Sequence, residues 1–215
     1  MKTFVDMVFP VKGKELAWDH SYSLFGSISR IQPLIHQEKN AVGVFPVNGL
    51  AQGNRTLKLT PKSSLRLRVP QKQIADFLCL MGSSLELDGR RIRLGNPRIE
   101  PIKATPRLFS PWVTLSECET IETFLTRVGE ELERLQIEAS YSPVAPLHQE
   151  SKDQGKGSRQ PNFIRRTRQV KGQNIVGFAL LVESLTAEDS MKLACLGLGG
   201  RRHFGGGLFL PARNR

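Results

Sequence analysis

The chain has 215 residues and a formal net charge of +11 at pH 7. This length can bury one large core or two smaller ones, and the excess of positive charge favours a polyanion partner over an acidic small molecule. The three cysteines, Cys79, Cys118 and Cys195, lie far apart without CxxC spacing, which argues against a disulfide framework or a zinc site and fits a cytoplasmic protein. Because the longest apolar run is too short to cross a bilayer and the first residues lack a signal-peptide pattern, we expect no membrane partner.

The basic residues are concentrated in four stretches. Residues 55–72 hold six basic and no acidic side chains, residues 90–107 hold six and one, residues 151–171 seven and one, and residues 197–215 four and none. Such segregation is typical of nucleic-acid-binding faces, although a solvated surface gives the same pattern. Aromatic residues make up only 7% of the chain, so for a nucleic-acid partner we expect recognition of shape and phosphates rather than of stacked bases.

In chain order, the first predicted elements are a strand and a helix. Residues 4–9 form an apolar run that ends at Pro10, which predicts a strand. Asp19 is the predicted N-cap of a helix whose apolar residues follow helical spacing up to Ile31, and Pro33 disfavours helix beyond that point. His36 is therefore expected just past the end of this helix.

A sheet, a second helix and a hairpin are predicted next. Strands are expected over residues 41–47, 56–59 and 64–69; in the third of these, apolar residues alternate with Arg66 and Arg68, which predicts one apolar and one basic face. A helix over residues 71–81 precedes two strands joined by Asp88-Gly89, a dipeptide typical of a tight hairpin turn.

The second half repeats this order of elements. A capping box is predicted at Ser116 and Glu119, and Thr186 with Asp189 is predicted to cap a later helix. The polar stretch 142–161, rich in Pro, Gly, Ser and Lys, is expected to be a loop that orders on RNA. The other elements are predicted from apolar periodicity: strands over 108–115, 164–170, 175–181 and 208–210, and helices over 121–135 and 187–196.

Each half thus reads strand, helix, strands, helix, strand, which is the order of a ferredoxin-like β-α-β-β-α-β unit. We therefore predict an α+β fold of two tandem ferredoxin-like units, residues 1–104 and 105–215, with a boundary at the Thr105-Pro106 turn. The halves share no visible sequence repeat, so this prediction depends on element order alone.

A glycine-rich loop, GLGGRRHFGGGLF, occupies residues 197–209. It is not a P-loop, because it lacks GK[ST] and leads from a helix into a strand, and the same direction excludes a dinucleotide fingerprint. Permissive backbone could approach a sugar-phosphate chain closely. A plain connector with a helix C-cap at Gly197 is the alternative. The predicted RNA contacts in this loop are Gly199, Gly200, Arg201, Arg202, His203, Gly205 and Gly206.

Two segments resemble a known family. A helix followed by GxG, a short basic segment, a second glycine cluster and a C-terminal strand resembles the glycine-rich loop of the RAMP superfamily, specifically of the CRISPR-associated endoribonucleases that process precursor crRNA. The segment DHSYSLFGSISRIQPLIHQE, residues 19–38, resembles their first helix, which is followed by a histidine. The resemblance implies tandem ferredoxin-like folds and metal-independent cleavage of a CRISPR repeat RNA, without a cofactor, by attack of a 2′-hydroxyl. The products would carry a 2′,3′-cyclic phosphate and a 5′-hydroxyl.

Carried over by position, the family's catalytic histidine falls on His36. Its helix tyrosine falls near Ser29, and the nearest counterpart of its supporting lysine is Lys39. We therefore expect His36 to act as general acid or base, supported by Lys39 and Ser29. His20 is the competitor, because at a helix N-terminus the dipole would lower its pKa; from the residues alone the two histidines are equal candidates, and either could be structural.

RNA contacts are also expected outside the glycine-rich loop. Arg165, Arg166 and Arg168 are the leading candidates because they precede this loop in the second unit, and Arg66, Arg68, Arg91 and Arg93 could follow phosphates as well. For each arginine, ordinary solubility is the alternative. No carboxylate cluster has metal-ligand spacing, which agrees with metal-free chemistry.

Two other functions stay open at this point. A non-catalytic RAMP subunit would bind crRNA with other subunits of an effector complex and use the same loop without cutting. An unrelated basic RNA-binding protein, such as a ribosomal protein, would show the same charge.

Overall fold

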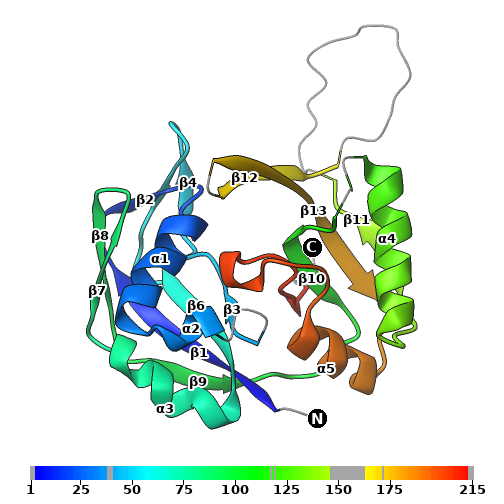
Figure 1. Cartoon of the computed structure of the whole chain (residues 1–215), viewed down its shortest axis with the longest axis horizontal. Coiled ribbons are helices and arrows are strands. Elements are labelled where there is room, and N and C mark those ends of the chain that lie inside the picture. The colour runs from blue at the N-terminus through cyan, green and yellow to red at the C-terminus, as the bar shows by residue number, and fades with distance from the viewer. Residues whose placement is uncertain are drawn as a thin grey trace, which may run out of the picture.

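The computed structural model describes residues 3–37, 41–116, 118, 120–145, 163–170 and 172–212. Two antiparallel sheets, one from each half of the chain, lie side by side with the glycine-rich loop between them (Figure 1). The first sheet contains, in spatial order, β3 (Gly43–Val44), β6 (Ser64–Pro70), β1 (Phe4–Lys12), β8 (Arg90–Leu94) and β7 (Ser84–Leu87), with β9 (Arg98–Pro101) also paired to β1. The second contains β11 (Ser140–Pro143), β13 (Gln173–Glu183), β10 (Leu108–Val113) and β14 (Leu210–Pro211), with β12 (Arg165–Val170) also paired to β13.

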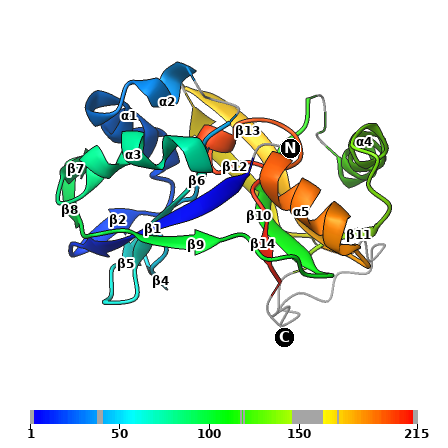
Figure 2. The same ribbon diagram turned by 90° about the horizontal axis from the view of Figure 1, so that it is seen from below.

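Short elements complete the two halves. The first half also holds the small sheet of β2 (Glu15–Ala17), β5 (Thr56–Lys58) and β4 (Leu50–Gln52). Its helices α1 (Ser21–Ile31), α2 (Leu34–Gln37) and α3 (Ile74–Phe77) lie on one side of the first sheet, opposite β4 and β5 (Figure 2). The second half contributes α4 (Ile121–Arg134), α5 (Ala187–Leu196) and the 3-10 turn η3 (Arg202–Phe204). Two more 3-10 turns, Gln71–Gln73 and Leu78–Leu80, flank α3.

The two halves share one strand order. Within the two sets of four strands β3-β6-β1-β9 and β11-β13-β10-β14, numbered in chain order inside each set, the spatial order is second, third, first, fourth in both, and every neighbouring pair is antiparallel. This mixed α and β arrangement is consistent with a ferredoxin-like unit in each half. The hairpin of β7 and β8 and the small sheet are additions to that pattern in the first half.

Strand β6 shows the predicted alternation. Leu65, Leu67 and Val69 are fully buried against the helices, and Leu67 stands opposite Met7 of β1. Arg66 and Arg68 lie on the opposite, basic face as predicted, but this face is only partly open to solvent, because Arg68 is 1% exposed and contacts the second half of the chain.

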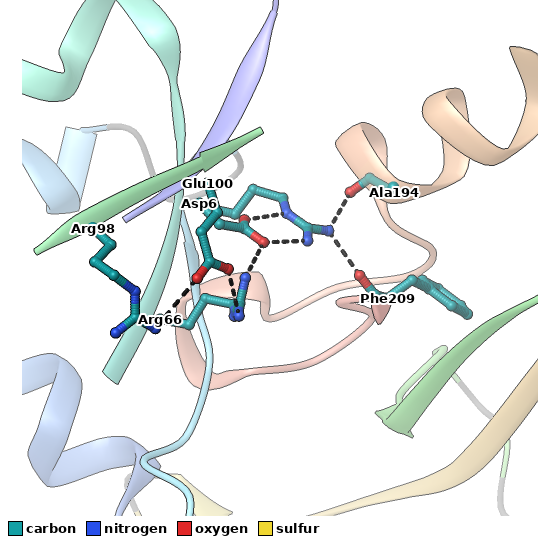
Figure 3. Close-up of polar contacts among 7 residues, drawn as sticks. Asp6, Arg66, Arg98, Glu100, Ala194 and Phe209 are labelled. Atoms are coloured by element: carbon teal, nitrogen blue, oxygen red, sulfur yellow. Dashed lines mark hydrogen bonds and ion pairs between the residues drawn. The ribbon is translucent and has the colours of Figure 1, made fainter. Parts of the chain in front are cut away.

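The arginines of β6 form ion pairs within the first half, and Arg68 also links the two halves (Figure 3). Arg68 forms an ion pair with buried Asp6 of β1, with its Nε 2.8 Å from Oδ1, and donates from Nη1 to the carbonyl oxygens of Ala194 at 2.7 Å and Phe209 at 2.8 Å. Arg66 lies 2.7 Å from Asp6 and 3.0 Å from Glu100. These contacts account for the position of both arginines without RNA.

Two predicted helix caps are wrong and one is confirmed. Asp19 does not cap α1; its carboxylate accepts from the Gln169 N–H of β12 at 3.0 Å. Helix α4 is capped by Thr120, which accepts from the Thr123 N–H at 3.3 Å, and not by Ser116. Thr186 caps α5 as predicted, accepting from the Asp189 N–H at 3.1 Å.

Other elements differ in extent. The strand predicted over 41–47 is reduced to β3, the helix predicted over 71–81 is split into α3 and two 3-10 turns, and β4 and β9 were not predicted. The predicted loop over 142–161 begins inside β11, and its residues 146–161 lie outside the described part of the chain. Within the described residues, no helix combines the length and the apolar character needed to cross a membrane.

Candidate functional site

The glycine-rich loop is tightly packed. Gly197, Gly199, Gly205 and Gly207 have positive φ angles between +60° and +82°, a region that glycine adopts without strain. A Cβ on Gly205 would lie 2.7 Å from Pro46, and one on Gly206 would lie 2.6 Å from the Gly200 carbonyl oxygen. Gly205 and Gly206 are buried, whereas Gly199 and Gly200 are exposed. Gly199 and Gly200 are thus open to a ligand in this conformation whereas Gly205 and Gly206 are covered, and the RNA contacts of all four stay predictions.

The two arginines of this loop point in opposite directions. Arg202 is 5% exposed, and its guanidinium donates to the carbonyl oxygens of Leu196 and, at 2.8 Å, of Cys195. It thus caps the C-terminus of α5, and burial lowers the pKa of Arg202 to about 10. In this conformation Arg202 contacts the protein itself, and its RNA contact stays a prediction. Arg201 is exposed, in a left-handed conformation with φ 61°.

The turn η3 brings His203 against helix α1. The His203 ring centroid lies 4.9 Å from that of Phe25, and the ring of Phe204 packs on Phe25 at 5.2 Å. His36, on α2, places its ring 5.0 Å from Phe25 in an edge contact. Both histidines line one cavity of about 670 Å³, here called the histidine cleft, with Tyr22, Phe25, Arg30, Glu86, Asp88, Arg201 and Phe204 among its other residues.

The histidine cleft combines proton-transfer groups with positive charge. Arg30 and Arg201 are both exposed, and Arg30 donates to the Ser27 hydroxyl at 2.7 Å. Tyr22 is 45% exposed, with its ring 5.8 Å from that of Phe204. Imidazole exchanges protons near neutral pH and guanidinium binds phosphate, so this set of side chains can act on a phosphodiester.

Sequence reasoning did not predict Tyr22 or Arg30 as residues of the site. The helical spacing of Tyr22, Phe25 and Gly26 with Arg30 was the available signal, because residues three and four apart share one helix face. Lys39, the predicted supporting lysine, lies outside the described residues.

His20 has a different environment. It is 1% exposed, its Nδ1 lies 2.8 Å from the Ala17 carbonyl oxygen, and the Val47 N–H donates to its Nε2 at 3.0 Å. Burial lowers the pKa of His20 and outweighs the hydrogen bond to Ala17, which raises it. Both nitrogens of His20 are thus paired inside the protein in this conformation, and its role in proton transfer stays a prediction.

Ser29 is also buried, and its hydroxyl donates to the Phe25 carbonyl oxygen one turn earlier. Serine inside a helix often forms this hydrogen bond to the carbonyl oxygen one turn earlier. Ser29 is not among the residues that line the histidine cleft, and its support of His36 stays a prediction.

The three arginines of β12 differ in their surroundings. Arg168 stacks over Trp112, with 4.4 Å from its Cζ to the ring centroid, and donates to the Ser21 hydroxyl at 2.6 Å and to the Phe204 carbonyl oxygen. Burial lowers the pKa of Arg168 to about 10. Arg168 thus has contacts within the protein and also lines the cavity described next. Arg165 is exposed, and the RNA contacts of both arginines stay predictions.

Arg166 lines a cavity of about 790 Å³ between the two halves. We call this cavity the basic groove; its walls include Trp18, Arg55, Lys62, Arg66 and Arg166. The Arg166 Nε is buried, has no hydrogen-bond partner among the described residues, and burial lowers the pKa of Arg166. Trp18, which sequence reasoning did not single out, is 47% exposed here.

A search of the described residues for groups of three or more His, Cys, Asp and Glu side chains that could hold a metal ion finds none.

Comparisons with known proteins agree with this arrangement. The model of the Cas6 CRISPR family matches residues 5–214. A CRISPR-associated endonuclease Cas6 from Myxococcus xanthus strain DK1622 is 35% identical over 211 residues, which cover 98% of this chain and 83% of that protein.

Solved structures show the same fold. A CRISPR-associated protein Cas6 superposes with a TM-score of 0.64 at 10% identity, covering 98% of this chain and 99% of the other. A RAMP protein described as binding different RNA substrates gives 0.65 at 12% identity, covering 98% and 100%. A Cas6-related protein from Pyrococcus furiosus gives 0.63 at 12% identity, covering 99% of both chains. From the family match over nearly its whole length and the 35% identical relative, the chain belongs to the Cas6 family of CRISPR-associated endonucleases.

Proposed function

We propose that this protein is a metal-independent endoribonuclease that binds CRISPR repeat RNA and cleaves precursor crRNA. The observation that carries the proposal is that exposed His36 and the outward-facing part of the glycine-rich loop, Arg201 and His203, line one cleft. The Myxococcus xanthus relative, named an endonuclease, supports it. The proposal includes two ferredoxin-like units, residues 1–104 and 105–215, that place these two segments face to face, and a cytoplasmic location.

The reaction that fits the cleft is an internal transesterification. The ribose 2′-oxygen bonds to the neighbouring phosphorus while the bond from phosphorus to the 5′-oxygen breaks. A base takes the proton of the 2′-hydroxyl and an acid gives a proton to the departing 5′-oxygen, so a 2′,3′-cyclic phosphate and a 5′-hydroxyl form. We assign one of these proton transfers to His36, because an exposed imidazole can serve either role near neutral pH.

Positive charge in the cleft stabilises the crowded phosphate. Arg30 and Arg201 are the guanidinium groups among its described residues, and guanidinium donors suit the oxygens of a phosphorane-like state. In this proposal Arg30 and Arg201 supply the supporting positive charge that the sequence analysis expected from Lys39. The role of Lys39 stays a prediction.

The basic groove is the proposed path for RNA away from the cut. Arg55, Lys62 and Arg166 present positive charge along it, and the buried, unpaired Nε of Arg166 is a donor that a phosphate oxygen would satisfy. Arg165 extends this charge on the exposed side of β12.

The test uses purified full-length protein and end-labelled repeat RNA in EDTA, with wild type beside His36→Ala. We expect one site-specific cut by wild type, no cut when the ribose at that linkage is 2′-deoxy, and a loss of about 10²–10⁴-fold in single-turnover rate for His36→Ala with RNA affinity retained. Arg98→Ala is the matched control, because Arg98 is exposed and lines neither cavity.

Other results would point to the alternative functions. Binding of repeat RNA without any cut by wild type would contradict the enzyme and favour a crRNA-binding subunit of an effector complex. Binding that depends strongly on salt and does not prefer the repeat would favour a general RNA-binding protein.

A further inference from the structure

We infer that His203 is a second catalytic residue of this site and shares the two proton transfers with His36, one imidazole serving the 2′-hydroxyl and the other the departing 5′-oxygen. The inference rests on the proposed function, and it gives the glycine-rich loop a role in the chemistry as well as in binding.

The placement of the two rings carries this inference. His36 and His203 come from opposite ends of the chain, yet both contact the same side chain, Phe25, with centroid distances of 5.0 and 4.9 Å. Their centroids therefore lie at most about 9.9 Å apart. Both rings border the same cavity of about 670 Å³. A phosphodiester between them could be within hydrogen-bond reach, about 2.6–3.2 Å, of an imidazole on each side.

The backbone around His203 is held in place from three directions. The neighbouring Arg202 side chain is anchored on the last carbonyl groups of α5. On the other side, the Phe204 carbonyl oxygen accepts from Arg168, and the Phe204 ring packs edge-on against Phe25. Gly205 completes the turn with a φ of 82°, donating its N–H to the Arg202 carbonyl oxygen at 3.0 Å. This support is what a proton-transfer group needs, because misplacement by about 1 Å can cost 10²-fold in rate.

The other polar groups of the cleft are weaker candidates for the second proton transfer. The Asp88 carboxylate accepts from the Ser23 hydroxyl at 2.8 Å, and Arg30 and Arg201 act as fixed positive charges. Glu86 and Tyr22 also line the cavity. Of all these side-chain types, imidazole is the one that ordinarily titrates near neutral pH and can serve equally as donor or acceptor.

The experiment compares two RNAs that differ at one atom. In the first, the scissile linkage is natural; in the second, the bridging 5′-oxygen is replaced by sulfur, so the leaving group departs as a thiolate and needs no general acid. Single-turnover cleavage in EDTA is measured for wild type, His36→Ala, His203→Ala and His203→Asn. Affinity for the uncleavable 2′-deoxy RNA and the unfolding temperature are measured for each, which separates chemistry from binding and folding.

The expected result has two parts. On natural RNA, His203→Ala and His203→Asn each lose about 10²–10⁴-fold in rate with affinity within a few-fold of wild type. On the sulfur-bridged RNA, the loss shrinks to less than about 10-fold for the histidine that serves as acid and persists for the one that serves as base. Rescue of either histidine alone supports the pair and assigns the two roles.

Three results would overturn the pair while leaving the proposed function in place: natural-RNA rates within about 3-fold of wild type for both His203 variants, rescue of neither histidine, or rescue of both. The first result would limit His203 to a structural or RNA-contacting role. Either of the other two results would show that His36 and His203 do not divide the general-acid and general-base roles between them. If wild type itself does not cut in EDTA, the proposed function fails and the inference fails with it.

Discussion

Arginine has opposite roles in two neighbouring regions of this molecule. At the junction of the two halves, Arg68 and Arg202 are at most 5% exposed and donate to main-chain carbonyl groups at the end of α5 and beside β14. In the histidine cleft, Arg30 and Arg201 are exposed and border a cavity. The same side chain thus holds protein to protein at the junction and presents positive charge in the cleft.

This difference shows why net charge alone overstates the RNA-binding surface. A buried guanidinium needs acceptors within the protein, and Arg68 meets Asp6 and two carbonyl oxygens while Arg202 meets two carbonyl oxygens. Such arginines add to the formal charge of +11, yet their side chains are buried and bind oxygens of the protein itself. Exposure and the position of the partners decide which arginines can bind RNA.

Of the variants that test this difference between buried and exposed arginines, Arg68→Ala is expected to have the largest effect. Arg68→Ala removes one partner of a buried ion pair and leaves the Ala194 and Phe209 carbonyl groups without their donor, so we expect the free energy of unfolding to fall by about 3–5 kcal/mol. Urea denaturation at neutral pH measures this change. Arg98→Ala is the control, because that side chain is 68% exposed and its loss should stay within about 0.5 kcal/mol.

The same variant tests the role of the junction. At a temperature where Arg68→Ala is folded, its affinity for repeat RNA should match that of wild type. A tenfold loss of RNA affinity with unchanged stability would show that Arg68 belongs to the RNA-binding surface after all.

Local patterns in the sequence were enough to predict several elements of the fold. The alternation of Leu65, Leu67 and Val69 predicted β6, and Asp88-Gly89 predicted the turn between β7 and β8, where both residues have positive φ angles. The position of Pro33 placed His36 beyond α1. These features depend on neighbours within a few residues, which a sequence displays directly.

Features that depend on distant partners could not be predicted in this way. The burial of Arg68 depends on Asp6 and on α5, and the Asp19 side chain is engaged by Gln169 instead of by its own helix. In the cleft, the contact of His203 with Phe25 exists only because the two halves pack together. Spacing along the chain gives no measure of such contacts.

The next largest effect concerns the pH dependence of stability at His20. Burial lowers the pKa of His20 in the folded state below its ordinary value of 6.5, so below that pH the unfolded chain binds a proton that the folded protein does not. Stability is therefore full above about pH 6.5 and falls as the pH decreases toward the folded-state pKa, by at most about 1.4 kcal/mol per pH unit from this group.

Thermal unfolding of wild type and His20→Asn between about pH 7.5 and 5.5 measures this term. The variant should be less stable at the upper end, because the hydrogen bonds to Ala17 and Val47 are disturbed, and should lose less stability than wild type as the pH falls. Parallel curves for the two proteins would show that His20 does not remain neutral in the folded state.

The last prediction compares two adjacent arginines. Arg201→Ala should leave the unfolding temperature unchanged, because the side chain is exposed, and should weaken repeat-RNA binding a few-fold while reducing the slope of log affinity against log salt by about 1. Arg202→Ala should do the reverse: it destabilises the protein by about 1–3 kcal/mol by leaving the Cys195 and Leu196 carbonyl groups without their donor, with the salt slope preserved. Filter binding across a salt series, combined with thermal unfolding, separates the two variants. If both variants change the salt slope equally, Arg202 leaves its buried position when RNA binds. The difference between the buried arginines of the junction and the exposed arginines of the cleft would then hold only for the RNA-free protein.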